Sequence, residues 1–156
     1  MSPDADTRKR AVRRNRKNFV EDNNFSTLAA QPYVSLESYR RDGSGVRTPV
    51  WHVVFDDRLY VFTERASWKV KRILRSPGVA LAACDWRGGS PGLWLPGQAR
   101  VIGSEPARGD EAQLIQRVYG ALDAKYGWQM RLTNAASRLA GRIDGRCELE
   151  ITATQA

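Results

Sequence analysis

The sequence predicts a mainly β, α+β protein: a small antiparallel barrel of six strands with two or three helices packed outside it. Strand-forming segments mostly follow one another with short turns between them, no βαβ alternation occurs, and no segment repeats. With 156 residues, 42% hydrophobic and 27% charged, the chain has the composition of one ordinary globular domain.

Basic residues gather at the N-terminus. Residues 1–17 hold seven lysines and arginines but only two aspartates, so the rest of the chain carries only +3 of the net charge of +8. We interpret residues 1–24 as a basic extension, disordered or loosely helical, ahead of a barrel domain at 25–156. Such an arm can contact nucleic acid electrostatically, but a solvated extension is the interpretation we favour.

The first half of the domain is predicted as an antiparallel meander. Its expected elements are a short helix over 25–30 and strands over 33–40, 46–55 and 58–63. Asp56–Asp57 form a tight turn between the second and third strands. In the third strand, Leu59 and Val61 face one side, and Tyr60 and Phe62 face the other.

The second half mixes helices with strands. Its expected elements are helices over 68–75, 107–126 and 130–140 and strands over 79–86, 93–102 and 146–152. One helix carries an apolar stripe, formed by Leu114, Ile115, Val118, Tyr119 and Leu122. In the last strand Cys147, Leu149 and Ile151 alternate with polar residues, which predicts that only one face is buried.

Two prolines interrupt predicted strands. Pro49 cannot donate to a strand ladder, so it marks an edge, a bulge or a place where something other than a strand lies alongside. At Pro96–Gly97 we expect a break in the strand 93–102.

Few residues offer conventional catalytic or metal chemistry. Cys84 and Cys147 are isolated, so we expect two buried thiols, and the single histidine, His52, excludes a histidine-rich metal site. We find no nucleotide-binding glycine loop and no nucleophile–base set. Without a long apolar run or a secretory leader, we expect a cytoplasmic protein with no membrane span.

Three cations crowd into the first turns of the helix predicted at 68–75. Lys69, Lys71 and Arg72 lie in the stretch TERASWKVKRIL, and a cation at a helix N-terminus is unfavourable by about 0.3–1 kcal/mol. Ser67 is a good N-cap, so we expect the helix to start at Trp68. Either the charges simply point to water, or an anion binds there.

The second interpretation predicts a phosphate site. The free amides of the helix, the hydroxyls of Thr63 and Ser67, and the ammonium groups of Lys69 and Lys71 would converge near one end of the helix. Amide donors together with cations at a helix terminus are a suitable environment for a phosphate.

The run TPVWHVVFDDRLYVFTERASWKVKRILRSPGVALAACDWRG at 48–88 resembles the F420-dependent branch of the pyridoxamine 5'-phosphate oxidase-like split β-barrel family. The similarity rests on the TPVW strand, the phosphate segment T-x-x-x-S-x-K-x-K-R, the strand start SPGV and the CDWRG loop. It extends over about residues 28–152 through KYGWQMRL, SRLAGR and ELEIT, and leaves the basic extension outside.

The resemblance implies a homodimeric split barrel with the cofactor at the subunit interface. It implies a phosphate held by Lys69, Ser67 and Thr63, with Lys71 beside them. It also implies a tricyclic ring lined by Thr48, Pro49, Val50 and Trp51, mostly through backbone groups, and a weaker assignment of Gln98 near the ring.

Three residues, Trp68, His52 and Trp94, depart from the family pattern. Trp68 replaces a small residue between the serine and the lysine, so it either stacks on the cofactor or narrows its entry. For both Trp51 and Trp68, however, we favour a packing role over stacking on the cofactor. His52 is a candidate proton donor, although a structural histidine is the interpretation we favour.

The function that the resemblance implies is an F420-dependent oxidoreductase. Reduced coenzyme F420, a deazaflavin, would pass a hydride to an electron-poor double bond of a small organic substrate. Two alternatives stay open: an FMN-binding oxidase or reductase of the same fold, and a non-catalytic split barrel that binds a cofactor or nucleic acid.

Overall fold

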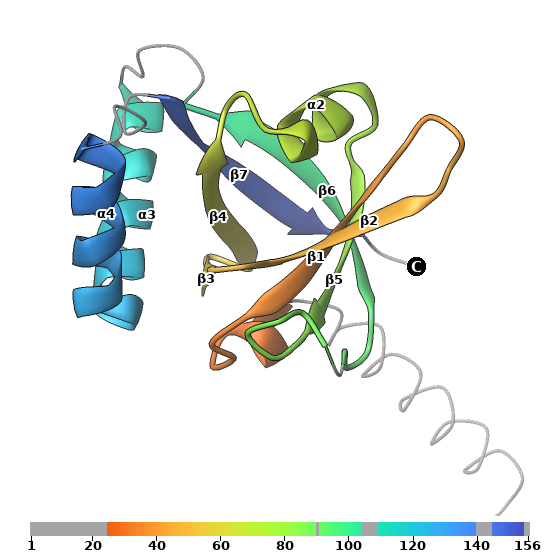
Figure 1. Cartoon of the computed structure of the whole chain (residues 1–156), viewed down its shortest axis with the longest axis horizontal. Coiled ribbons are helices and arrows are strands. Elements are labelled where there is room, and N and C mark those ends of the chain that lie inside the picture. Colours follow the sequence, from red (N-terminus) through yellow and green to blue (C-terminus); the bar gives the residue numbers. More distant parts are fainter. Residues whose placement is uncertain (1–24, 90, 104–108, 140–144, 155–156) are drawn as a thin grey trace, which may run out of the picture.

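The computed structural model describes residues 25–154 except Ser90, 104–108 and 140–144 (Figure 1). The basic extension therefore lies outside the described residues, and its contact with nucleic acid stays a prediction. The helical elements are η1 (Phe25–Leu28), α2 (Trp68–Arg75), α3 (Asp110–Tyr126) and α4 (Trp128–Leu139). The strands are β1 (Val34–Tyr39), β2 (Gly45–Val50), β3 (Val53–Phe55), β4 (Arg58–Glu64), β5 (Gly78–Ala83), β6 (Leu95–Ile102) and β7 (Arg146–Ala153).

The strands form one antiparallel sheet in the order β2-β1-β5-β6-β7-β4-β3. Its two edge strands, β2 and β3, are consecutive in the chain, with only Trp51 and His52 between them. The sheet must therefore curl until its edges meet, which confirms the predicted barrel with helices outside it (Figure 1).

The predicted strand 46–55 is wrong as a single strand, and this accounts for seven strands instead of six. The chain pairs with β1 up to Val50 and with β4 from Val53, so it changes partner at Trp51–His52. Pro49 lies on the edge strand β2, opposite Ser35 of β1. Of the three predicted alternatives, an edge, a bulge or a neighbour that is not a strand, the structure thus shows the edge.

Two hydrophobic clusters lie on opposite faces of the sheet. Leu59 and Val61 of β4 point into the barrel, whereas Tyr60 and Phe62 point toward α3 and α4, which confirms the predicted alternation. The turn between β3 and β4 is also confirmed, because Asp56 and Asp57 both have positive φ, at 51° and 60°.

The last strand, β7, is buried on both faces, which corrects the prediction of a half-buried strand. Cys147 lies on the inner face as expected, but Glu148 and Glu150 on the other face are only 2% and 5% exposed. The buried carboxylate of Glu150 has hydrogen-bond partners there, because it accepts from Arg100 at 2.8 Å and from the Tyr60 hydroxyl at 3.1 Å.

Two further boundaries differ from the prediction. Strand β6 runs through Pro96 and Gly97 without the expected break, because Pro96 faces Ala80 and Gly97 lets Ile151 and Phe25 pack against its backbone. Strand β5 ends at Ala83, so residues 84–86 belong to the following loop rather than to the strand.

The two cysteines, Cys84 and Cys147, are buried and free, as predicted. Among the described residues, none of the helices combines the length and the apolar character that a membrane span needs.

Candidate functional site

A cavity of about 310 Å³ opens on the surface where four elements meet. Its described lining comes from the end of β2 and the residue after it, from β4, from α2 and from α4, namely Pro49, Val50, Trp51, Phe62, Lys69 and Thr133. The fold thus brings together the TPVW strand and the lysine of the predicted phosphate segment, which are separated in the sequence.

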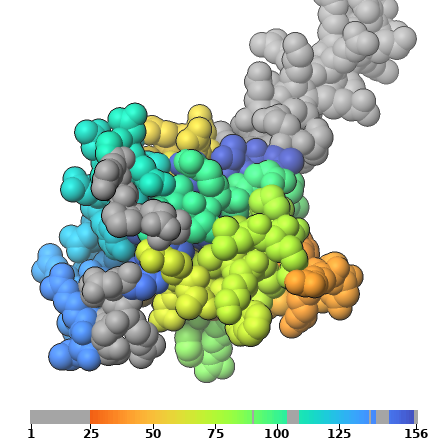
Figure 2. Space-filling view, turned by 90° about the horizontal axis from the view of Figure 1, so that it is seen from above, coloured from red at the N-terminus to blue at the C-terminus, as the bar shows by residue number. Residues whose placement is uncertain are grey.

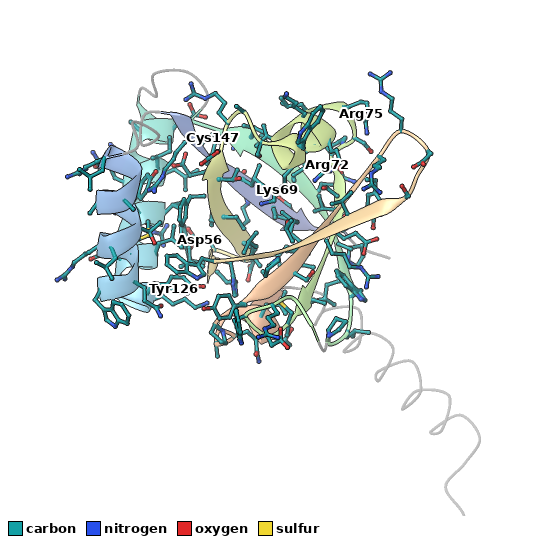
Figure 3. All side chains as sticks on the ribbon, in the orientation of Figure 1. Asp56, Lys69, Arg72, Arg75, Tyr126 and Cys147 are labelled. Atoms are coloured by element: carbon teal, nitrogen blue, oxygen red, sulfur yellow. The ribbon has the colours of Figure 1, made fainter. Side chains whose placement is uncertain are left out.

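Helix α2 places Lys69 at this cavity. The helix begins at Trp68 as predicted, because the Ser67 hydroxyl accepts a hydrogen bond from the backbone N–H of Val70 at 3.4 Å. From the first turn, Lys69 projects toward the interior, between β4 and β2 (Figure 3).

The ammonium group of Lys69 is half-buried and lacks a counter-ion among the described residues. Burial, and then the positive charge of Arg72, lower the pKa of Lys69. A partly desolvated cation at a helix N-terminus is electrostatically unfavourable on its own, and a bound anion would relieve both costs.

The other cations of α2 do not reach the cavity. Arg72 donates to the Ser38 hydroxyl at 2.8 Å, and Arg75 donates to the carbonyl of the last β1 residue at 2.9 Å. Both arginines therefore tie α2 to β1, although Arg75 is also exposed. Lys71 is exposed, with its ammonium 4.4 Å from the ring centre of Trp68.

Trp68 itself is 72% exposed, so it does not line the described part of the cavity. In the view from above, the yellow-green atoms of α2 form part of the surface beside the orange hairpin of β1 and β2 (Figure 2). Because Trp68 and Lys71 are exposed, they lie on the outer side of this helix, whereas Lys69 lies on the side that faces the cavity.

Three more predicted site residues, Thr48, Thr63 and Ser67, lie on or next to elements that form the cavity but do not line its described wall. Thr48 is half-buried on β2, opposite Leu36, and Thr63 is half-buried near the end of β4. Ser67 uses its hydroxyl to cap α2. Gln98 is exposed on β6 between β5 and β7, away from the other predicted ring residues in the strand order.

Residues 20–155 match the family described as pyridoxamine 5'-phosphate oxidase. The chain belongs to this family. The match covers the whole described barrel together with its helices, so family membership applies to the domain and not to one motif. No curated protein matches the chain.

Solved structures share the split barrel of the pyridoxamine 5'-phosphate oxidase family with this chain at low identity. An F420 reductase is 16% identical, with a TM-score of 0.52 over 82% of this chain and 91% of that one. An FMN-binding, pyridoxamine 5'-phosphate oxidase-related protein of Nostoc punctiforme is 15% identical, with a TM-score of 0.52 over 98% and 81%. The heme storage protein HutZ of Vibrio cholerae is 9% identical, with a TM-score of 0.59 over 91% and 89%.

In this member of the pyridoxamine 5'-phosphate oxidase family, His52 has the surroundings of a structural residue. Its side chain is fully buried, and its Nε2 lies 2.6 Å from the carbonyl oxygen of Leu28, so this nitrogen carries the proton. Burial lowers the pKa of His52 to about 4, and the nearby ammonium of Lys125 acts in the same direction. The described lining of the cavity does not include His52.

Sequence reasoning did not assign Phe62, Thr133 or Tyr126 to the site. The ring of Tyr126 stacks on Trp51 with centroids 4.7 Å apart and planes 12° apart, and Phe62 is tilted against Trp51 at 6.3 Å. The alternation of β4 already placed Phe62 on the helix-facing side. Thr133 gave no signal, because its position depends on how α4 packs.

Proposed function

We propose that the protein is an oxidoreductase that uses reduced coenzyme F420 to deliver a hydride to an electron-poor double bond of a small organic substrate. One observation carries this proposal: a single cavity joins the end of the edge strand β2 to the half-buried ammonium group of Lys69. A cofactor with a flat ring and a phosphate-bearing side chain matches both ends of the cavity. The ring fits the apolar end at β2, and the negative phosphate fits the positive end at Lys69.

The end of β2 suits a flat ring. As an edge strand, β2 pairs with β1 on one side only, so its other side offers backbone groups to a ligand. Pro49, Val50 and Trp51 present an apolar surface there, and Thr48 precedes them on the same strand. A volume of about 310 Å³ is at the low end of the roughly 300–1,000 Å³ typical of small-molecule sites.

The start of α2 suits a phosphate. Lys69 supplies an ammonium group without a described carboxylate partner, and the first amides of α2 add partial positive charge. Thr63 and Ser67 lie on either side of the turn that leads into the helix. The Ser67 hydroxyl accepts the Val70 N–H as the helix cap and still has its own hydrogen to donate to a phosphate.

The protein residues bind, orient and exclude water, and the bound deazaflavin supplies the hydride chemistry. Trp51 and Phe62 keep the ring side of the cavity apolar. Within the described lining, Lys69 is the only titratable side chain, and it is assigned to the phosphate. We therefore expect the proton that completes the reduction to come from solvent.

A homodimer belongs to the same proposal. The cavity is open on one side, and α4, which contributes Thr133 to its wall, exposes Trp128, Leu132 and Leu139 by 67%, 60% and 91%. A second copy would cover apolar surface of this kind and close the cavity. Light scattering of the purified protein would give twice the monomer mass, and a monomer would contradict this part of the proposal.

The cofactor is identified by titrating the purified protein with reduced or oxidised F420 and, separately, with FMN, while following tryptophan emission. Trp51 lies in the cavity wall, so its emission is expected to be quenched by a bound ring. Tight binding of F420 with weak binding of FMN supports the proposal. Tight FMN binding without F420 binding would replace it with the flavin alternative, and binding of neither would favour a non-catalytic protein.

Lys69→Met tests the phosphate assignment, with Lys71→Met as its matched control on the outer side of the same helix. Because a hydrogen bond to a charged group contributes about 1.5–3 kcal/mol, Lys69→Met should weaken F420 binding by about 10- to 150-fold. Lys71→Met should change the dissociation constant by less than about threefold, as expected for an exposed charge. Equal losses in both variants would contradict the assignment.

A further inference from the structure

We propose that Tyr126 is a positioning residue of this cavity: it holds the indole of Trp51 in the orientation that the bound ring meets. The inference rests on the proposed function, because it takes the cavity to be the site of a planar ligand. Tyr126 lies at the C-terminal end of α3, where that helix faces β3 (Figure 3).

The two rings are in contact over their faces. Their centroids lie 4.7 Å apart and their planes differ by 12°, which is the geometry of stacked aromatic side chains. Trp51 is only half-buried because it also lines the cavity, whereas Tyr126 is 8% exposed. Tyr126 therefore supports the indole from the protein side and leaves the cavity side of Trp51 for a ligand.

The hydroxyl of Tyr126 is fixed at the same place. It accepts a hydrogen bond from the backbone N–H of His52 at 3.0 Å and lies 3.0 Å from the carbonyl oxygen of Pro32 and 3.2 Å from that of His52, to which it can donate. His52 follows Trp51 directly, in the two-residue junction where the chain leaves β2 for β3. The side chain of Tyr126 thus holds both the backbone of His52 and the indole of Trp51 at the junction between the edge strands β2 and β3.

Lys125, the neighbour of Tyr126, fastens the same end of α3 to the barrel. Its ammonium group donates to the carbonyl oxygens of Ala29 at 3.0 Å and of His52 at 3.1 Å. The end of α3 is therefore anchored to the segment before β1 and to the junction at once. Because these hydrogen bonds hold Tyr126 in place, its ring cannot move aside when Trp51 changes its side-chain rotamer. Tyr126 therefore restricts the indole of Trp51.

The consequence is a cavity wall that is ordered before the ligand arrives. An indole free to change its rotamer would have to be ordered during binding, which weakens binding, whereas a stacked indole is already in place. The ring centroids of Trp51 and Phe62 lie 6.3 Å apart, so a fixed indole also limits the movement of Phe62, a second residue of the lining.

The test compares Tyr126→Phe, Tyr126→Leu and Tyr119→Leu with the unchanged protein. Tyr126→Phe keeps the stack and loses the hydroxyl, and Tyr126→Leu loses both. Tyr119→Leu removes a half-buried ring from the same helix that has no ring contact with Trp51 in the described structure, so it controls for general loosening of α3. All variants are also made in a background in which Trp68, Trp86, Trp94 and Trp128 are phenylalanine.

Two signals are measured: the near-ultraviolet circular dichroism of Trp51 without cofactor, and the dissociation constants of F420 and FMN. We expect Tyr126→Leu to lose most of the Trp51 signal and to bind the cofactor about three- to tenfold more weakly, whereas Tyr126→Phe retains the signal and most of the affinity. Tyr119→Leu should leave the Trp51 signal unchanged.

The inference is overturned if Tyr126→Leu keeps the Trp51 signal, or if it weakens cofactor binding no more than Tyr119→Leu does. If the unchanged protein binds neither cofactor, the proposed function fails and the assignment of Tyr126 to a cofactor wall fails with it. The ligand-free Trp51 signal separates that result from one in which Tyr126 never restricted the indole.

Discussion

The buried ring of His52 makes the stability of the fold depend on pH. In the folded protein, Nε2 donates to the carbonyl oxygen of Leu28 and lies 3.3 Å from the ammonium nitrogen of Lys125. A second proton would place a buried positive charge beside that ammonium group, without a carboxylate partner among the described residues. Acidification is therefore expected to destabilise the fold through this residue.

The magnitude follows from the two pKa values of His52, about 4 in the folded protein and 6.5 in the unfolded chain. Between these values the unfolded chain binds the proton and the folded protein does not, so stability present above pH 6.5 is lost as the pH falls toward 4. At about 1.4 kcal/mol per pH unit, the loss reaches about 3 kcal/mol by pH 4. Such a loss is a large fraction of the roughly 5–15 kcal/mol that stabilises a typical domain.

The assay is urea unfolding of the unchanged protein and of His52→Gln at several pH values from 7 to 4. Glutamine can still donate an amide hydrogen toward Leu28, but it does not titrate. Between pH 7 and pH 4, the free energy of unfolding should fall by about 3 kcal/mol less in His52→Gln than in the unchanged protein. Carboxylates such as Glu148, whose pKa burial raises, contribute equally to both proteins and cancel in the difference. Parallel curves for the two proteins would refute the reasoning.

Three further substitutions test the packing of the barrel and the cap of α2. Gly97→Ala should destabilise the fold by about 1–3 kcal/mol, because its new methyl group would lie 2.8 Å from the Ile151 side chain and 3.1 Å from Phe25. Gly120→Ala is its control: it adds the same methyl group to α3 where nothing lies within 4 Å, and should stabilise by up to about 1 kcal/mol. Ser67→Ala should cost about 0.5–1 kcal/mol in thermal or urea unfolding through loss of the α2 cap, and no loss would show that the 3.4 Å bond is unimportant.

The start of α2 shows how far local sequence reasoning reaches. Ser67 as N-cap and Trp68 as first helical residue follow from side-chain chemistry within four positions, and the structure confirms both. The side of α2 on which each lysine or arginine side chain lies does not follow from the local sequence. Lys69 and Lys71 are two positions apart and lie on different sides of the helix, and Arg72 finds its partner, Ser38, on β1.

The junction at Trp51–His52 and the strand β7 show where local reasoning stops. Residues 46–55 were predicted as one strand because most of them favour extended backbone. Pro49 signalled an irregularity, but it does not reveal that the chain exchanges β1 for β4 as its partner after Val50. The alternation of β7 correctly gave the inward face. The burial of Glu148 on the other face involves α3, more than twenty residues away, whose Tyr119 forms a hydrogen bond with Glu148.

The sequence by itself determined the barrel, the order of its elements, the start of α2 and a candidate phosphate segment, because periodicity, capping and turn chemistry act over a few neighbouring residues. The candidate ring segment at 48–51 came instead from the resemblance to a known family. The tertiary structure decided which of the candidates meet. It placed Lys69 with Trp51 and Phe62, added Thr133 from α4, and set Tyr126 behind the indole. These contacts join distant segments, and their geometry depends on how a curled sheet and its helices pack against each other.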